Sequence, residues 1–450
     1  MHSDHVLNRR SWLSHVGGMA TLAAIPQLSA APAAAPRRLK VAAVVTEFTH
    51  RSHAHVILEN FLEPYYFNGQ LTDSGMDIVS LYVDQQPEGR DMSVDVAKTY
   101  QIPIYPTIAE TLRCGGGHLA VDAVLSIGEH GSYPTSERGQ VMYPRKRFFD
   151  EIASVFRHDG KSVPVFNDKH LSFRWDWAHE MVQVARELNI PFMAGSSVPL
   201  AERRPPLELP ENSVIQEAVS IHSGNLEGYD FHALEVLQSI VEARRGGESG
   251  IADVQLLEGD DVWKAAEEGR WSLSLGEAAL RTGPDSNAAS LRDFVEPADG
   301  QKHGVHAILV RYNDGLKATV LRIGAASTRW KFACTLAGQK TPLATSFYVG
   351  PWENRNLFKA LSHAIQTHFR NAAAPYPIER TLLITGVVAA VMDSKFEKNV
   401  LVKTPHLNLS YQPVDFRAMR EMGESWKIIT EDQPQPDGIN PGGPRPPARS

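Results

Sequence analysis

The chain has 450 residues, a formal net charge of −7 and two cysteines. The mildly acidic balance argues against a nucleic-acid-binding protein, because phosphate binding needs a basic surface. Cys114 and Cys334 cannot build a disulfide framework or a structural zinc site, although a single bond between them is possible. No apolar run reaches about 18 residues, so we expect no transmembrane helix.

The N-terminal segment predicts export. Arg9 and Arg10 precede a weakly apolar stretch, which ends in the small residues of positions 30–35. An arginine pair, a mild hydrophobic region and an A-x-A-like end are typical of a twin-arginine signal, and an ordinary basic leader is the alternative. We therefore expect residues 1–35 to address the twin-arginine export machinery, which carries folded proteins, and the mature protein to be periplasmic or extracellular.

The first half of the body alternates strand-like and helical patterns. Residues 39–46 (LKVAAVVT) form a continuous apolar run, as expected of a strand buried on both faces, and a helical stripe follows at 54–62. Further strand-like runs lie at 77–83, 102–105, 121–127, 163–166 and 190–194, and further helical stripes at 148–156 and 178–188. This alternation predicts an α/β, Rossmann-type doubly wound parallel sheet over residues 39–200. Ligands of such sheets bind beyond the carboxyl ends of the strands.

The second half changes character after a proline-rich stretch at 203–210. It offers a helix at 231–245, a hairpin of two strands at 307–312 and 317–322, a strand at 329–336 and a helical stripe at 357–369. These patterns predict an α+β domain with a mainly antiparallel sheet over residues 201–413. Residues 431–450 hold six prolines and three glycines, which predicts a flexible tail.

The loop after the first strand, residues 46–53, contains no glycine. A dinucleotide site uses glycine there, because the backbone must approach a pyrophosphate at the helix N-terminus. Glu47 and Phe48 of this loop are nevertheless candidate cofactor contacts, and Ser52 is expected to cap the next helix. Asp84 ends the second strand, where an acidic residue commonly binds a ribose hydroxyl; an exposed loop aspartate is the alternative.

Polar residues also follow the fourth and fifth strands. Gly128, Glu129 and His130 stand after the fourth strand, where a Glu-His pair suits ligand contact or proton transfer. Asp168 and Lys169 follow the fifth strand, where a partly desolvated lysine can exchange a proton with a hydroxyl. A packed loop histidine and a solvated lysine are the structural alternatives.

Asp230 and His232 begin the first long helix of the second domain. From there they could face the crevice between the domains. The alternative is an N-terminal acid that the helix dipole favours, beside a surface histidine.

A family resemblance rests on the order of several short segments. Asp168-Lys169-His170, the helix with Glu180-Met181-Val182, and residues 190–195 (IPFMAG) resemble the Glu-Lys-Pro segment of the glucose–fructose oxidoreductase/inositol dehydrogenase/MocA family. Residues 375–383 (PYPIERTLL) and 404–407 (TPHL) before Tyr411 are also similar to it. The resemblance spans residues 39–413.

The resemblance implies an NAD(P)-dependent oxidoreductase of sugars or polyols, which can form homo-oligomers. It implies that Lys169 contacts the substrate hydroxyl and the nicotinamide, that His232 acts as acid or base, and that residues 128–130 lie near the cofactor. Three features depart from the family pattern: the loop lacks glycine, the proline of the Glu-Lys-Pro segment is His170, and the acid expected four residues before the histidine is Gly228.

Three functional hypotheses follow. The first is an exported oxidoreductase that uses NAD or NADP on a sugar or polyol hydroxyl, with Lys169, His232 and Asp230 as catalytic residues. The second is a non-redox lyase or hydrolase of carbohydrates, which the missing glycines favour; in it a divalent metal would be bound by residues after the fourth and fifth strands, namely Glu129, His130, Asp168 and His170. The third is an inactive sugar-binding protein on the same fold.

Overall fold

The computed structural model describes residues 37–283, 290–295, 304–324, 330–436, 438 and 439. Residues from Arg38 onward form one unit, to which all elements below belong. The predicted signal peptide, residues 1–35, lies outside the described residues.

Valine-rich runs form the first sheet, as the sequence predicts. Its described strands are all parallel, in the order β4-β1-β5-β6-β7. They are β1 (Leu39–Val45), β4 (Met76–Val83), β5 (Ala123–Ile127), β6 (Val165–Asp168) and β7 (Phe192–Gly195). The run at 102–105 forms no strand, and Ile104 makes only an isolated parallel bridge with Leu81. Pro103 interrupts that run and has no backbone N–H to give to a ladder.

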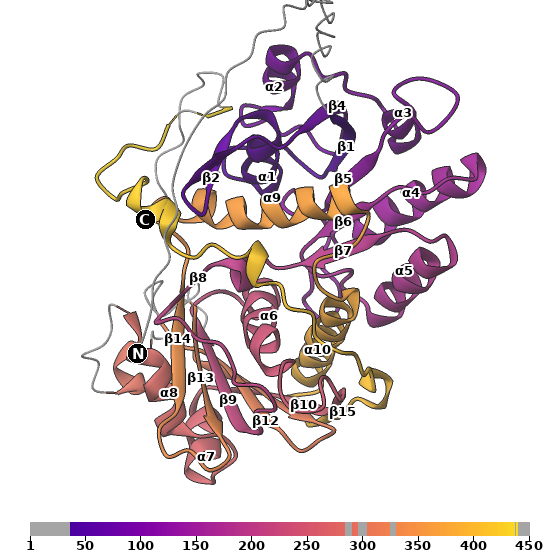
Figure 1. Cartoon of the computed structure of the whole chain (residues 1–450). Coiled ribbons are helices and arrows are strands. Elements are labelled where there is room, and N and C mark those ends of the chain that lie inside the picture. Colours follow the sequence, from indigo (N-terminus) through magenta and orange to yellow (C-terminus); the bar gives the residue numbers. More distant parts are fainter. Residues whose placement is uncertain (1–36, 284–289, 296–303, 325–329, 437, 440–450) are drawn as a thin grey trace, which may run out of the picture. The chain divides into compact units, whose positions relative to one another are not determined.

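Helices flank this sheet on both sides (Figure 1). They are α1 (His53–Leu62), α2 (Ser93–Tyr100), α3 (Ile108–Arg113), α4 (Arg145–Asp159) and α5 (Trp175–Glu187), and a small hairpin joins β2 (Tyr65–Phe67) to β3 (Gln70–Thr72). Ser52 caps α1, and its Oγ accepts from the backbone N–H of His55 at 3.4 Å. The predicted Rossmann-type α/β architecture is therefore confirmed.

The second sheet is mixed and mostly antiparallel, in the order β15-β10-β11-β12-β9-β13-β14-β8. Only the β9–β12 pair among these described strands is parallel. The strands are β8 (Glu202–Arg204), β9 (Ile215–His222), β10 (Ile251–Glu258), β11 (His306–Tyr312), β12 (Lys317–Arg322), β13 (Lys331–Leu336), β14 (Leu343–Tyr348) and β15 (Val402–Lys403). The predicted hairpin is β11–β12, and the predicted antiparallel character of this half is confirmed.

Helices cover both faces of the second sheet. On one face lie α6 (Gly228–Val241) and α10 (Ile378–Phe396), whose apolar side chains share one core with β9 to β13. On the other face lie α7 (Asp260–Glu267) and α8 (Leu273–Leu280), which pack against Val219, Ile221 and Ala333. This sheet therefore has its own core on each side.

Two long helices connect the two sheets. α9 (Asn354–Asn371) follows the second sheet in the chain but packs against α1 and β2 beside the first (Figure 1). α10 packs against α5 and α6 and reaches both β7 and β10. The predicted boundary at residue 200 lies between the two sheets. However, α9 belongs to the predicted second domain by its position in the chain, and its apolar face completes the core of the first sheet.

The described part of the C-terminal segment lies against α9 and the β1–α1 loop. The backbone oxygen of Gln433 accepts from Trp352 Nε1 at 3.2 Å, and that of Pro436 accepts from Arg355. Ile439 is buried in the core of the first sheet. Ile439 of the predicted tail is thus buried and Gln433 and Pro436 make backbone contacts, whereas residues 431–434, 436 and 438 are exposed and the rest of the tail lies outside the described residues.

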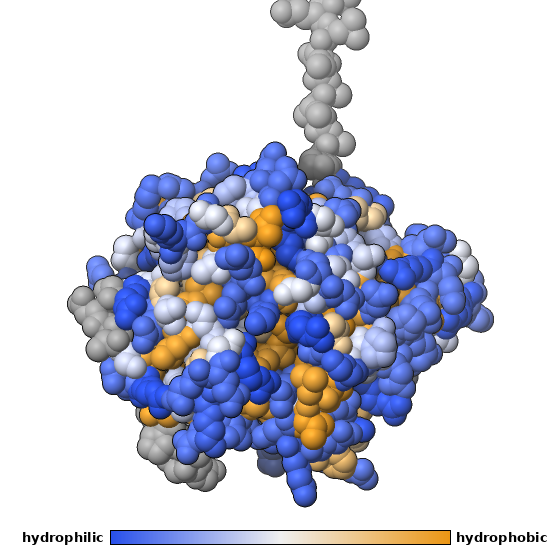
Figure 2. All heavy atoms as spheres, turned by 90° about the horizontal axis from the view of Figure 1, so that it is seen from below, coloured by the Kyte–Doolittle hydropathy of each residue, from blue (hydrophilic) through white to orange (hydrophobic). Residues whose placement is uncertain are grey.

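The described part of the chain has no disulfide bond between its two cysteines, and the face seen in Figure 2 is mostly hydrophilic. Cys114 and Cys334 are both free thiols, so the possible bond between them is not formed. Seen from the second-sheet end, the surface is mostly hydrophilic, and its apolar side chains form a broken band (Figure 2). Within the part of the chain that the structure describes, none of the helices has the length and apolarity to cross a membrane.

Candidate functional site

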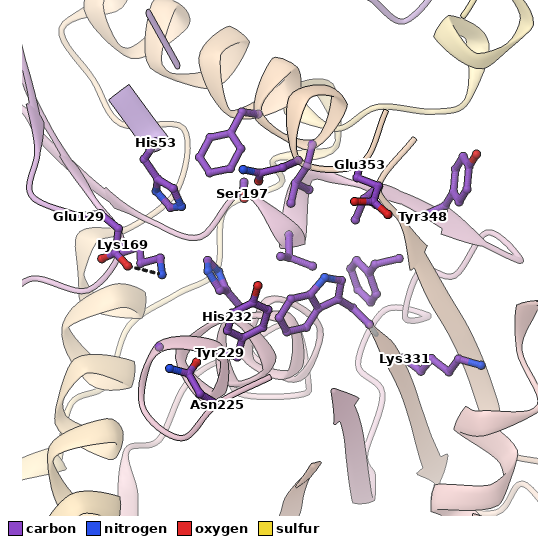
Figure 3. Close-up of a pocket in the computed structure, with 18 of the residues that line it drawn as sticks. His53, Glu129, Lys169, Ser197, Asn225, Tyr229, His232, Lys331, Tyr348 and Glu353 are labelled. Atoms are coloured by element: carbon purple, nitrogen blue, oxygen red, sulfur yellow. Dashed lines mark hydrogen bonds and ion pairs between the residues drawn. The ribbon is translucent and has the colours of Figure 1, made fainter. Parts of the chain in front are cut away.

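A cleft of about 630 Å³ opens between the carboxyl ends of the first sheet and the second-sheet region. Residues that follow β1, β5, β6 and β7 line one wall, and residues of α6 and of the second sheet line the other (Figure 3). Tyr229 and Trp330 stack in that second wall, with ring centroids 5.6 Å apart and an interplanar angle of 10°. The cleft thus lies where a doubly wound sheet places its ligands.

A buried ion pair stands at the strand-end wall. Lys169 Nζ lies 2.8 Å from Glu129 Oε1, and Arg145 donates to the other oxygen of Glu129. Burial alone would raise the pKa of Glu129, but the positive charges of Lys169 and Arg145 outweigh it and hold that pKa well below its usual range. Glu129 is therefore an anion that fixes Lys169 at the edge of the cleft.

The geometry of the loop after β5 depends on Gly128. A Cβ at this position would lie 2.7 Å from Arg145 Cγ. Without that atom Arg145, which is almost fully buried, can pass the loop and reach Glu129. Gly128 itself does not line the cleft, so its role is to admit Arg145.

A second pair joins the ends of α1 and β6. His53, the first residue of α1, has its Nδ1 2.6 Å from Asp168 Oδ2, and both side chains are buried. His53 lines the cleft, whereas Asp168 lies behind it. His53 is not among the residues predicted from the sequence, because it stands at the end of a loop interpreted as a nucleotide loop. Its one signal in the sequence is its place directly after a helix-capping serine.

His232 lies on α6, on the opposite side of the cleft from His53 (Figure 3). Its Nδ1 is 2.6 Å from Ser196 Oγ, which follows β7. Burial, reinforced by the charge of Lys169, lowers the pKa of His232 well below its usual value, so the imidazole is neutral. The structure therefore brings Lys169 and His232 to one cleft.

His130 and His170 occupy different positions. His130 lines the cleft with a backbone φ of 69°, and burial lowers its pKa to about 4. His170 is buried beside Arg145, 3.2 Å from its Nη1. His130 faces the ligand space, whereas His170 packs behind the Glu129 pair.

Asp230 does not reach the cleft. Its Oδ1 lies 2.8 Å from Nε2 of both His222 and His306, and its Oδ2 accepts from the backbone N–H of Glu227. Among the described residues this is the one group of three side chains whose ligand-type atoms are close enough to hold a metal. The backbone N–H of Gly224 donates to His222 Nδ1, so Nε2 carries the proton and donates to Asp230. Asp230 is therefore a structural acceptor behind the cleft wall, because its first-turn position turns its side chain toward β9 and β11.

The alternative metal set is not assembled. Glu129 is taken by Lys169 and Arg145, and Asp168 by His53. Together with His130 and His170, these carboxylates form no group of converging metal ligands in the described ranges. Positive side chains stand where the ion would have to bind.

The candidate cofactor residues after β1 and β4 are engaged with their own chain. The backbone oxygens of Thr46 and Phe48 accept from the N–H groups of Gln85 and Met92 at 2.8 and 2.7 Å. Glu47 is buried and accepts from Thr49 Oγ1 at 2.9 Å. A buried acidic side chain in this loop disfavours the binding of a negatively charged pyrophosphate there.

Contacts also bridge the crevice between β4 and β5. Gln85 and Ser132 exchange two hydrogen bonds of 2.9 and 2.8 Å. Asp84 accepts from Tyr82, Tyr133 and Arg147, so the oxygens expected to bind a ribose are occupied. The groups that a glycine-rich loop and a ribose-binding acid would offer to a dinucleotide are therefore engaged within the chain here.

Comparison with solved structures defines the class of the fold. GenD2 from gentamicin A biosynthesis, in complex with NAD, matches with a TM-score of 0.50 and 12% identity over 82% of this chain and 96% of its own. Apo scyllo-inositol dehydrogenase from Lactobacillus casei matches with a TM-score of 0.50 and 12% identity over 82% of this chain and 98% of its own. This chain therefore shares the fold of these two proteins.

At this identity the likeness establishes the architecture, in agreement with the family resemblance of the sequence. No family model matches the sequence, and no curated protein matches it.

Proposed function

We propose that this protein is an enzyme that acts on a hydroxyl group of a sugar or polyol bound in the cleft. The observation that carries the proposal is the meeting of Lys169 and His232 in one cleft beside the stacked rings of Tyr229 and Trp330. Aromatic rings with a few converging polar groups suit a polar ring-shaped ligand. The scyllo-inositol dehydrogenase of the same fold, named for a polyol, supports this substrate class.

The two polar residues have complementary properties. Lys169 is positioned by its ion pair with Glu129, and its side-chain amino group can donate a hydrogen bond to a substrate oxygen. His232 is neutral, so it can hydrogen-bond a hydroxyl without adding charge. Together they are placed to bind a hydroxyl and to exchange its proton.

The redox version of this proposal is an NAD- or NADP-dependent oxidoreductase. A fold neighbour solved with NAD supports that cofactor. When bound, a nicotinamide would supply the hydride acceptor for the carbon that carries the hydroxyl.

The occupied crevice between β4 and β5 instead favours the non-redox candidate, a carbohydrate lyase, hydrolase or isomerase-like enzyme. In either version the described residues supply the chemistry at the hydroxyl.

Calorimetry tests the proposal and separates its two versions. The purified protein is titrated with inositols and aldoses, with and without NAD or NADP. We expect a sugar or polyol to bind to the wild type and to Lys98→Met, which changes an exposed lysine of α2, but not to Lys169→Met. In the assay that the bound ligand identifies, Lys169→Met should lose about 10²–10⁴-fold in activity.

Binding of NAD(P) selects hydride transfer, and its absence together with sugar binding selects the non-redox version. Failure of every sugar and polyol to bind, or equal binding by Lys169→Met, would contradict the proposal.

We also propose export by the twin-arginine route, on the arginine pair at positions 9 and 10 and the small residues before position 36. Replacing both arginines by lysine should leave the full-length precursor in the cytoplasm, whereas the wild type is recovered from the periplasm without its leader. Export of the double variant at the wild-type level would rule out this address.

A further inference from the structure

The His53–Asp168 pair fixes the protonation pattern of one cleft histidine. An ionised carboxylate only accepts hydrogen bonds, so the ring nitrogen 2.6 Å from Asp168 Oδ2, Nδ1 of His53, carries the proton. In the neutral ring the other nitrogen, Nε2, then holds a lone pair. Since His53 lines the cleft and its ring points into it (Figure 3), this lone pair is available to a ligand.

Neighbouring rings hold this imidazole in place. The ring of Phe358 meets His53 edge-on at 4.6 Å, and that of His130 does so at 5.1 Å. Both rings belong to the cleft wall. His53 is therefore oriented by a carboxylate on one nitrogen and by aromatic packing on its faces.

The contacts of the Ser196–His232 pair allow the opposite pattern. Ser196 Oγ accepts from the backbone N–H of Val198 at 3.1 Å, and its proton is free to point at His232 Nδ1, 2.6 Å away. A ring that accepts at Nδ1 carries its proton on Nε2. His232 then offers an N–H to the cleft, as does the ammonium group of Lys169.

We propose that His53 is the general base of this cleft, with Asp168 as its positioning residue, and that His232 and Lys169 are donors opposite it. This inference rests on the proposed function and assigns its roles. A substrate O–H bond breaks as its proton moves to His53 Nε2, and the electron pair stays on the substrate oxygen. Asp168 stabilises the imidazolium that forms, while His232 and Lys169 donate to the oxygen atoms of the substrate.

Histidine side-chain NMR tests the assignment without any substrate. In protein labelled with ¹⁵N-histidine, His53→Gln and His232→Gln identify the two rings by the loss of their signals. We expect His53 to show the Nδ1–H form and His232 the Nε2–H form at neutral pH. The reverse form at either ring would overturn the assignment of that ring.

Two variants test the positioning residues. Asp168→Asn should remove the Nδ1–H preference of His53, whereas Asp84→Asn, which changes a carboxylate outside the cleft, should leave it intact. Ser196→Ala should release His232 from the Nε2–H form, whereas Ser197→Ala, its neighbour in the chain, should not. An unchanged His53 signal in Asp168→Asn would show that Asp168 does not set the tautomer.

With a ligand identified by calorimetry, Asp168→Asn should lower kcat about 10²–10⁴-fold with little change in KM. A raised KM with an unchanged kcat would instead show that Asp168 has only a structural role. Because the NMR signatures need no ligand, failure of sugar binding contradicts the proposed function and leaves the tautomer result to stand separately.

Discussion

Two regions at the same edge of the first sheet differ in their access to a ligand. The crevice above β1, β4 and β5 is closed by contacts of the chain with itself, in which Gln85, Ser132, Asp84 and Tyr133 satisfy one another. The cleft beyond β5, β6 and β7 is open and lined by Lys169 and three histidines. Ligands of open α/β sheets bind beyond the carboxyl ends of the strands, so only the open part of this edge can accept a ligand in the conformation described.

Arg145 separates the two regions. It begins α4 on the crevice side, yet its guanidinium reaches Glu129 and lies beside His170 at the cleft. A buried cation of this kind is retained only with charged or polar partners, because its desolvation is costly. The arrangement of the cleft therefore depends on a residue that never touches the ligand space.

The largest effect on stability is expected when the ion pair between Arg145 and Glu129 is removed. Arg145→Met leaves the buried Glu129 with one cation fewer, so the free energy of unfolding should fall by about 3–5 kcal/mol in a urea titration. Arg147→Met, on the same helix, removes a half-exposed partner of Asp84 and should cost no more than about 1 kcal/mol. Equal losses in the two variants would show that the buried pair has no special weight.

A pH dependence should sharpen the comparison on the cleft side. Glu235 of α6 is buried behind β7, its Oε1 accepts from Thr381 Oγ1 at 2.9 Å, and burial raises its pKa to about 7. Because the folded pKa lies above the unfolded one, its contribution to stability is fully present below about pH 4 and is lost as the pH rises through about 7.

Glu235→Gln imitates the neutral acid and should remove this decline. At pH 8 it should be more stable than the wild type by up to about 3 kcal/mol, with little difference at pH 4. Thermal unfolding across this range is the measurement, and Glu187→Gln, at an exposed position of α5, is the control. A parallel pH profile in wild type and Glu235→Gln would show that Glu235 is ionised throughout.

The smallest effect belongs to the crevice. Tyr133→Phe removes the hydroxyl that donates to Asp84 at 2.7 Å, and Tyr82 and Arg147 remain as partners of that carboxylate. The free energy of unfolding should fall by about 1 kcal/mol, and the tautomers of His53 and His232 should not change. A change in the cleft histidines would mean that the two regions are coupled.

The site was only partly predictable from the sequence. Lys169 and His232 could be predicted as cleft residues. Lys169 follows a strand and His232 stands near the start of a helix, and both elements have clear apolar patterns in the sequence. The sequence predicts Asp230 in the site, but its side chain lies outside the cleft lining and binds His306, 76 residues away. His53 was missed for the same reason, because Asp168, 115 residues away, gives it its chemical meaning.

The fold was predictable where the apolar period was clear. The strands of the first sheet and the β11–β12 hairpin follow from local patterns. α10 did not, because its helix is buried on nearly all sides between the two sheets and so has no single apolar face.

The sequence by itself determined a parallel α/β sheet, a mainly antiparallel second sheet and a loop without the glycines of a nucleotide site. Only the tertiary structure decided that this loop is closed by residues 84–92, that α9 returns to the first sheet, and that His53 and His232 line one cleft. The physical reason is that backbone periodicity is a local property of the chain, whereas the partner of a buried charge or imidazole is chosen by packing between distant segments.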